Sequence, residues 1–153
     1  MTSNDVSQLP PELTRSGRVD AMWYFSLPTE EERKEIFRIH LNKTGKNISD
    51  KLIEVAAANS KNYTGAEIQE ITKSAMRKAF KRYLQDNNDT IIEEDIIEAI
   101  KETIPLYDSS REKINFLESW VEGRARRANS DAALNEFKVL QDEDLANEIS
   151  LRI

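Results

Sequence analysis

Apolar residues recur along most of the chain at the three- and four-residue spacing of amphipathic helices, which predicts four to five helices from residue 29 onward. The first helix follows Thr29-x-x-Glu32, a capping box in which the Thr hydroxyl accepts a backbone N–H and the Glu reaches back to the cap. This helix is predicted to end near residues 42–45. A second capping box, Thr64-x-x-Glu67, begins the longest helix.

The remaining helices are shorter. One begins at Ser49 or Asp50 and ends near Asn59, and a later one ends at Thr103-Ile104-Pro105, because the residue before a proline resists the helical conformation. Ser109-x-x-Glu112 is expected to cap the last. The predicted apolar faces are Ile36, Phe37, His40 and Leu41; Leu52, Val55 and Ala56; Ile68, Ile71, Ala75, Ala79 and Tyr83; Ile92, Ile96, Ile97 and Ile100; and Ile114, Leu117, Trp120 and Val121.

The two ends of the chain differ from this helical part. Residues 21–28 form a short aromatic run stopped by Pro28, typical of a strand buried on both faces of a parallel sheet. A lone strand makes no sheet, so we expect its neighbours to lie outside this chain. Residues 128–153 are acidic and weakly periodic, which is compatible with a marginal helix or with disorder.

Composition narrows the possible chemistry. The 153 residues carry a net charge of -6, the wrong sign for general binding to nucleic-acid phosphates. There is no cysteine and one histidine, which excludes disulfides, thiol catalysis and multi-histidine metal sites. No long apolar run or signal peptide is present, so the sequence predicts a cytoplasmic protein without a membrane partner.

Ordered motifs fill the first part of the chain. They are T-x-N at 2–4, L-P-P-E-L at 9–13, R-x-G-R-x-D at 15–20, L-P-T-E-E-E-R at 27–33 and Y-T-G-A-E-I at 63–68. In this order and spacing they resemble the second region of homology and the helical lid domain of AAA-type ATPases, over residues 1 to about 127. The later piece, from Ile104-Pro105-Leu106 to Arg124-Ala125-Arg126, is similar to AAA proteins of plastid and cyanobacterial genomes.

The resemblance implies a domain division and a set of functional residues. Residues 1–28 would be a remnant of the α/β nucleotide-binding domain, 29–127 the lid and 128–153 a tail. Asn4 matches the sensor-1 position, where a neutral amide can donate to a phosphate oxygen and accept from water. Arg15 and Arg18 match the arginine fingers that reach a neighbouring subunit, where guanidinium groups stabilise phosphoryl transfer. Without the resemblance, these would be a turn Asn and two surface arginines.

Four further residues match positions that contact the nucleotide. Ile36 and His40 would line the adenine and ribose, and they project from one helix face because they are four residues apart. Gly65 and Ala66 match the sensor-2 region, where small side chains let a helix N-terminus approach phosphate. Many relatives carry an arginine there, and this chain does not. The plainer interpretations are a packed histidine and an ordinary helix start.

Other features favour structural roles. Trp120 fits a core position. The arginines Arg124, Arg126 and Arg127 fit a helix C-terminus, where positive charges are electrostatically favourable, and this role is favoured over phosphate or nucleic-acid binding. The negative charges of Glu30–Glu32 are favourable at the start of a helix, where the helix dipole is positive. No G-x-x-x-x-G-K-[ST] phosphate loop occurs, and no apolar strand ends in Asp-Glu to hold magnesium. We therefore expect ATP as the cofactor, with magnesium held only by motifs outside this chain, and no hydrolysis by the chain alone.

Three functions are compatible with these observations. The first is the C-terminal part of a AAA ATPase, separated by a split gene, an incomplete gene model or the choice of the expressed segment. Its partners would be the rest of the module, neighbouring subunits of a ring (usually a hexamer) and an unknown protein substrate. The second is a free-standing helical interaction module that binds a protein rather than nucleotide. The third, a nucleic-acid-associated helical protein, conflicts with the acidic charge.

Overall fold

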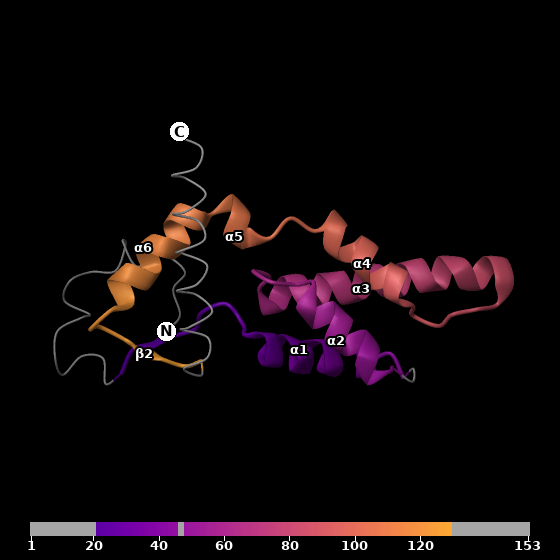
Figure 1. Cartoon of the computed structure of the whole chain (residues 1–153), viewed down its shortest axis with the longest axis horizontal. Coiled ribbons are helices and arrows are strands. Elements are labelled where there is room, and N and C mark those ends of the chain that lie inside the picture. Colours follow the sequence, from indigo (N-terminus) through magenta and orange to yellow (C-terminus); the bar gives the residue numbers. More distant parts are fainter. Residues whose placement is uncertain (1–20, 46–47, 130–153) are drawn as a thin grey trace.

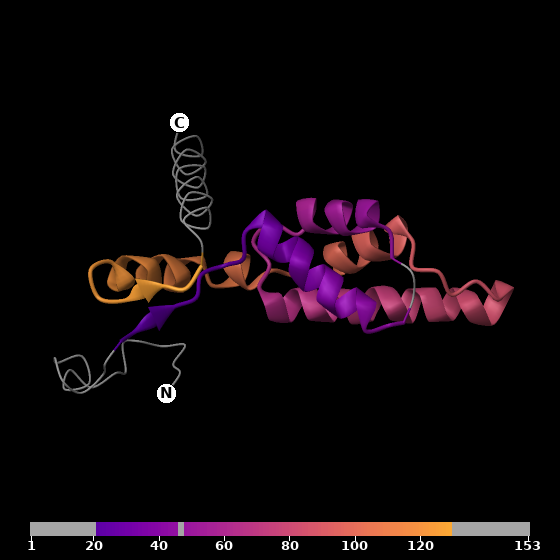
Figure 2. The same ribbon diagram turned by 90° about the horizontal axis from the view of Figure 1, so that it is seen from below.

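The structure is a computed structural model, and it describes residues 21–45 and 48–129. Four helices form a bundle: α1 (Glu30–Asn42), α2 (Asp50–Ala58), α3 (Gly65–Asp86) and α4 (Glu93–Glu102). A short turn of helix, α5 (Leu106–Ser109), then leads to α6 (Arg111–Val121). Figures 1 and 2 show α6 beside the two short strands β1 (Trp23–Tyr24) and β2 (Arg126–Arg127), at the opposite end of the molecule from the tip of α3. The described part is mainly helical, as predicted.

The hydrophobic core lies among α1 to α4, where each helix contributes the apolar face that its spacing predicts. Phe37 and Leu41 of α1 are fully buried between α2 and α3. Tyr83, predicted as the last residue of the α3 face, is 41% exposed because it lies beyond the end of the packed stripe. The other core residues are Leu52, Ile53, Ala56, Ala57, Tyr63, Ile68, Ile71, Ala75, Ala79, Ile91, Ile96, Ala99 and Ile100.

The predicted helix starts are confirmed at α1, α2 and α3. The Thr29 hydroxyl accepts from the Glu32 backbone N–H, and the Glu32 carboxylate accepts from the Thr29 N–H at 2.8 Å. Thr64 and Glu67 form the same reciprocal pair at α3, and Ser49 caps α2. These caps satisfy backbone donors that have no partner inside a helix. They fix where each helix begins.

The predicted start of the last helix is wrong. Ser109 ends α5, and its hydroxyl donates to the Leu106 carbonyl at 3.1 Å instead of capping a helix. The helix α6 begins at Arg111, after Ser110, without a side-chain cap. Pro105 sets this geometry: it ends the preceding segment, and the next residues form a separate single turn. Glu112 therefore lies in the first turn of α6 and reaches no cap at Ser109.

The strand prediction for residues 21–28 also needs correction. Only Trp23 and Tyr24 form β1, and its partner lies within the chain, because β1 pairs in parallel with β2 in the register Trp23 to Arg126 and Tyr24 to Arg127. Tyr24 is buried, whereas Trp23 and Phe25 are 57% and 76% exposed, so the strand is not buried on both faces. The residues after α6 thus return to the segment that precedes α1.

The basic cluster consequently divides into different roles. Arg124 donates to the Trp120 carbonyl at 3.0 Å, at the end of α6, as predicted for a cation at a helix C-terminus. Arg126 and Arg127 instead form β2. Trp120 is only half-buried and lies under the Arg124 guanidinium, 5.6 Å from its ring centre, so it is not a central core residue.

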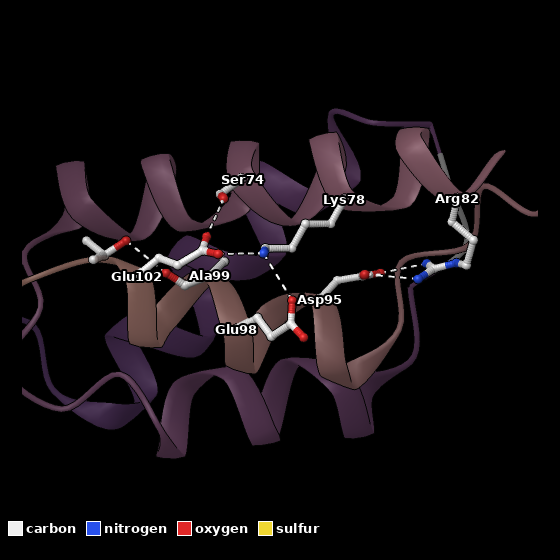
Figure 3. A network of polar contacts seen from close by, with 8 residues as sticks. Ser74, Lys78, Arg82, Asp95, Glu98, Ala99 and Glu102 are labelled. Atoms are coloured by element: carbon white, nitrogen blue, oxygen red, sulfur yellow. Dashed lines mark hydrogen bonds and ion pairs between the residues drawn. The ribbon is translucent and has the colours of Figure 1, made fainter. Parts of the chain in front are cut away.

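Polar contacts join α3 to α4 along one side of the bundle (Figure 3). Arg82 holds both carboxylate oxygens of Asp95, at 3.0 and 2.7 Å. Further along, the Lys78 ammonium contacts Glu98 at 3.1 Å and Glu102 at 2.7 Å. Asp95 is buried, while Glu98 and Glu102 are exposed, so the two groups of contacts differ in how far water screens them. No helix in the described residues is long and apolar enough to cross a membrane.

Candidate nucleotide-facing site

Ile36 and Gly65, two of the predicted nucleotide-contacting residues, lie together although they are far apart in sequence. Gly65 is the first residue of α3, and the position of a Cβ atom on it would be 3.7 Å from Cδ1 of Ile36. Ile36 is half-buried and packs partly against the core. The helix α1 therefore presents an apolar side chain to the N-terminus of α3, where backbone N–H groups lack helical partners.

An open pocket of about 390 Å³ lies at this junction. Its lining comes from the segment after β1, the helix α1, the start of α3 and Asn129, which lies two residues after β2. The lining residues are Ser26, Pro28, Glu32, Glu35, Ile36, Gly65 and Asn129.

Asn129 ties these parts together. Its side-chain oxygen accepts from the Ser26 backbone N–H at 2.7 Å, and its amide nitrogen donates to the Glu32 carboxylate at 3.2 Å. Glu32 in turn holds the cap of α1. The buried Arg33 adds a second link, since it donates to the carbonyls of Pro28 and Ala57 at 2.9 and 3.0 Å. The wall of the pocket is thus fixed by hydrogen bonds that span the chain.

The charge of the pocket favours a base or a sugar over phosphate. Its two ionisable lining residues are the glutamates Glu32 and Glu35, and Glu35 forms an ion pair with Arg38 at 2.6 Å. Carboxylates accept hydrogen bonds from hydroxyl and amino groups but repel phosphate oxygens. Ile36, Pro28 and Gly65 supply apolar surface for a planar ring.

His40 and Ala66 flank this pocket without lining it. His40 is half-buried one helical turn beyond Ile36 on α1, and burial lowers its pKa, with smaller contributions from the charges of Lys43 and Lys73. A lowered pKa keeps the imidazole neutral near pH 7, which suits hydrogen bonding and stacking. Ala66 is exposed beside Gly65 at the start of α3.

Three predicted site residues, Asn4, Arg15 and Arg18, lie outside the described residues. The structure also brings in two pocket residues that the motifs do not indicate, Ser26 and Asn129. Asn129 belongs to the predicted tail, and no local pattern connects it to α1, because its contact with Glu32 spans 97 residues. Within residues 21–45 and 48–129, no cluster of three or more His, Asp or Glu side chains could hold a metal ion.

Curated proteins similar to this chain carry AAA names. The AAA domain-containing protein ycf46 of Guillardia theta is 37% identical over 130 residues, which are 84% of this chain and 25% of that protein. Its counterpart in Trieres chinensis is 39% identical over 132 residues, again 84% and 25%. The vesicle-fusing ATPase of Arabidopsis thaliana is 33% identical over 124 residues, 73% of this chain and 17% of that protein. The chain belongs to the AAA family.

The fold agrees with this assignment. The crystal structure of the FIGL-1 AAA domain in complex with ADP matches with a TM-score of 0.63 at 20% identity, over 78% of this chain and 42% of that one. The chain corresponds to a C-terminal AAA portion, a lid region with a strand remnant. It spans about a quarter of the length of the ycf46 relatives. No protein-family model matches the chain.

Proposed function

We propose that this chain is the sensor, arginine-finger and lid part of a AAA ATPase that couples ATP binding and hydrolysis to remodelling of a protein partner. The observation that carries the proposal is the junction of Ile36 with Gly65, which joins two motif positions from separate helices at one open pocket. ATPase names among the relatives imply nucleotide use in the family. In this proposal Ile36, His40, Gly65 and Ala66 contact the adenosine.

The phosphates would then be held elsewhere. The glutamates of the pocket disfavour phosphate, so this proposal departs from the approach of phosphate that the sensor-2 resemblance implies for Gly65 and Ala66. The sequence also contains no phosphate loop. Asn4 would orient water at the γ-phosphate, and Arg15 and Arg18 would stabilise charge in the site of a neighbouring subunit of a ring. Magnesium would be held by the missing motifs. The chain alone should therefore show no magnesium-dependent ATP turnover.

The test is a titration of the ¹⁵N-labelled chain with adenosine, ADP and tripolyphosphate, followed by amide chemical shifts. We expect adenosine and ADP to shift the amides of Ile36, His40, Gly65 and Ala66. The dissociation constant should be on the order of 1 mM, because the pocket is open and offers few polar groups. Tripolyphosphate should leave these amides unchanged.

A matched pair of variants separates the site from the rest of α1. Ile36→Ala removes apolar surface from the pocket and should weaken adenosine binding about fivefold, whereas Ile39→Ala, on an exposed part of the same helix, should not. Circular dichroism checks that both variants fold. No shift with adenosine or ADP would reject nucleotide contact by this face and favour the free-standing interaction module.

A further inference from the structure

The long helix α3 has an exposed face opposite the core. Residues at spacings of three and four along this face are all exposed, and the structure places no other described element on it. The exposed residues are Ala66, Gln69, Glu70, Lys73, Arg77, Phe80, Lys81 and Leu84. The core residues Ile71 and Ala75 lie on the opposite side of the same helix.

Large apolar side chains gather near the C-terminal end of this face. Phe80 is 59% exposed, Leu84 70% and Tyr83 41%, and the rings of Phe80 and Tyr83 stack with centres 6.3 Å apart. Single exposed apolar residues are ordinary, but three neighbours on one helix end mark a surface that gains from being covered.

Basic groups precede this apolar end. Lys73 and Arg77 lie one turn apart, and both contact Glu70, at 3.6 and 3.0 Å. With Lys81, the face carries three basic residues and one acidic residue, a net charge of +2. An acidic segment with apolar side chains would complement both parts of the face.

We propose that residues 130–153 of the same chain form this segment and dock on the exposed face of α3. They contain six acidic and two basic side chains, a net charge of -4. They lie outside the described residues and follow Asn129, which lines the same pocket as Gly65, the first residue of α3. The segment therefore starts beside the N-terminal end of the helix.

Length and register fit this arrangement. Twenty-four residues in a helix span about 36 Å, close to the roughly 33 Å of the 22-residue α3. In a parallel alignment starting at 130 and Gly65, Leu145 falls level with Phe80 and Ile149 with Leu84. Asp142 then falls level with Arg77. Leu134, Leu145 and Ile149 share one helical face, since they are eleven and four residues apart.

Cysteine cross-linking tests the docking, since the chain has no native cysteine. The full chain carrying Leu84→Cys and Ile149→Cys should form an intramolecular disulfide with oxidised glutathione about ten times faster than the control with Glu54→Cys and Ile149→Cys. Glu54 is exposed on α2, away from the proposed surface. Mass spectrometry under non-reducing conditions distinguishes the products.

Adding Phe80→Asp to the Leu84→Cys and Ile149→Cys chain should slow the reaction at least threefold, because it places a carboxylate on the apolar end. Circular dichroism must show that the variant keeps its helix content. Equal rates in the two cysteine pairs would overturn the proposal. Disulfide-linked dimers as the main product would overturn it as well, because the occupant would then be a second copy.

Discussion

At the scale of single residues, His40 gives the chain a pH dependence. Its pKa lies below the ordinary value of 6.5, chiefly because of burial and then because of Lys43 and Lys73. The unfolded chain therefore binds this proton more readily than the folded chain. The stability contributed by neutral His40 is present above the ordinary pKa, and it is lost as the pH falls through 6.5 toward the lower folded value.

Urea unfolding between about pH 7.5 and 5.5 measures this effect. The free energy of unfolding should fall over this range in the parent chain, and the fall should be smaller in His40→Gln, which has no titrating side chain. The comparison removes the contribution of the carboxylates, which both chains share. The same pH dependence in both chains would contradict the prediction.

At the scale of elements, the two polar clusters between α3 and α4 should differ in their contribution to stability. Asp95 is buried, accepts two bonds from Arg82 and also accepts the Ile92 backbone N–H at 3.0 Å, at the start of α4. Asp95→Ala should lower the free energy of unfolding by about 2–3 kcal/mol, because it removes the carboxylate that pairs with Arg82 and accepts the backbone N–H at the helix start.

The exposed Glu98 provides the matched control on the same helix. Its bond to Lys78 is screened by water, and Lys78 keeps a second partner in Glu102 (Figure 3). Glu98→Ala should therefore cost less than about 0.5 kcal/mol. Chemical denaturation of the two variants measures the difference, and equal losses would show that burial does not separate the clusters.

Helices that depend on neighbouring residues can be predicted from the sequence, whereas contacts between distant residues cannot. The capping boxes at Thr29 and Thr64 and the apolar spacing of α3 are local, so the first helices follow from the residues alone. The pairing of Trp23 with Arg126 joins residues more than a hundred positions apart, and a two-residue strand has no pattern of its own. The same holds for Asn129 in the pocket. Family resemblance alone predicts a shared site for Ile36 and Gly65, and the fold brings the two residues together.

At the scale of the molecule, the described residues divide into a bundle of α1 to α4 and a smaller unit of α6, β1 and β2 (Figure 1). The bundle contains the hydrophobic core cluster, whereas the buried residues of the smaller unit include Tyr24, Val121 and Glu118. In it, the Glu118 carboxylate is buried and accepts from Arg127 at 2.5 Å. Burial raises the pKa of the Tyr24 hydroxyl, and the charge of Glu118 adds to the effect, so Tyr24 stays protonated.

Removing Glu118 should open the smaller unit while the bundle stays closed. Glu118→Ala leaves the Arg127 guanidinium without its buried carboxylate partner, a loss of about 3 kcal/mol, which corresponds to roughly 100-fold faster hydrogen exchange in α6. Exchange at Ile71 and Ala75 of α3 should not change, because the core of the bundle does not include Glu118. Glu112→Ala, on an exposed position of α6, is the control and should leave exchange in both units near the parent rates. Equal acceleration of hydrogen exchange in α6 and α3 would mean that the chain opens as one unit and that the bundle depends on the contact between Glu118 of α6 and Arg127 of β2.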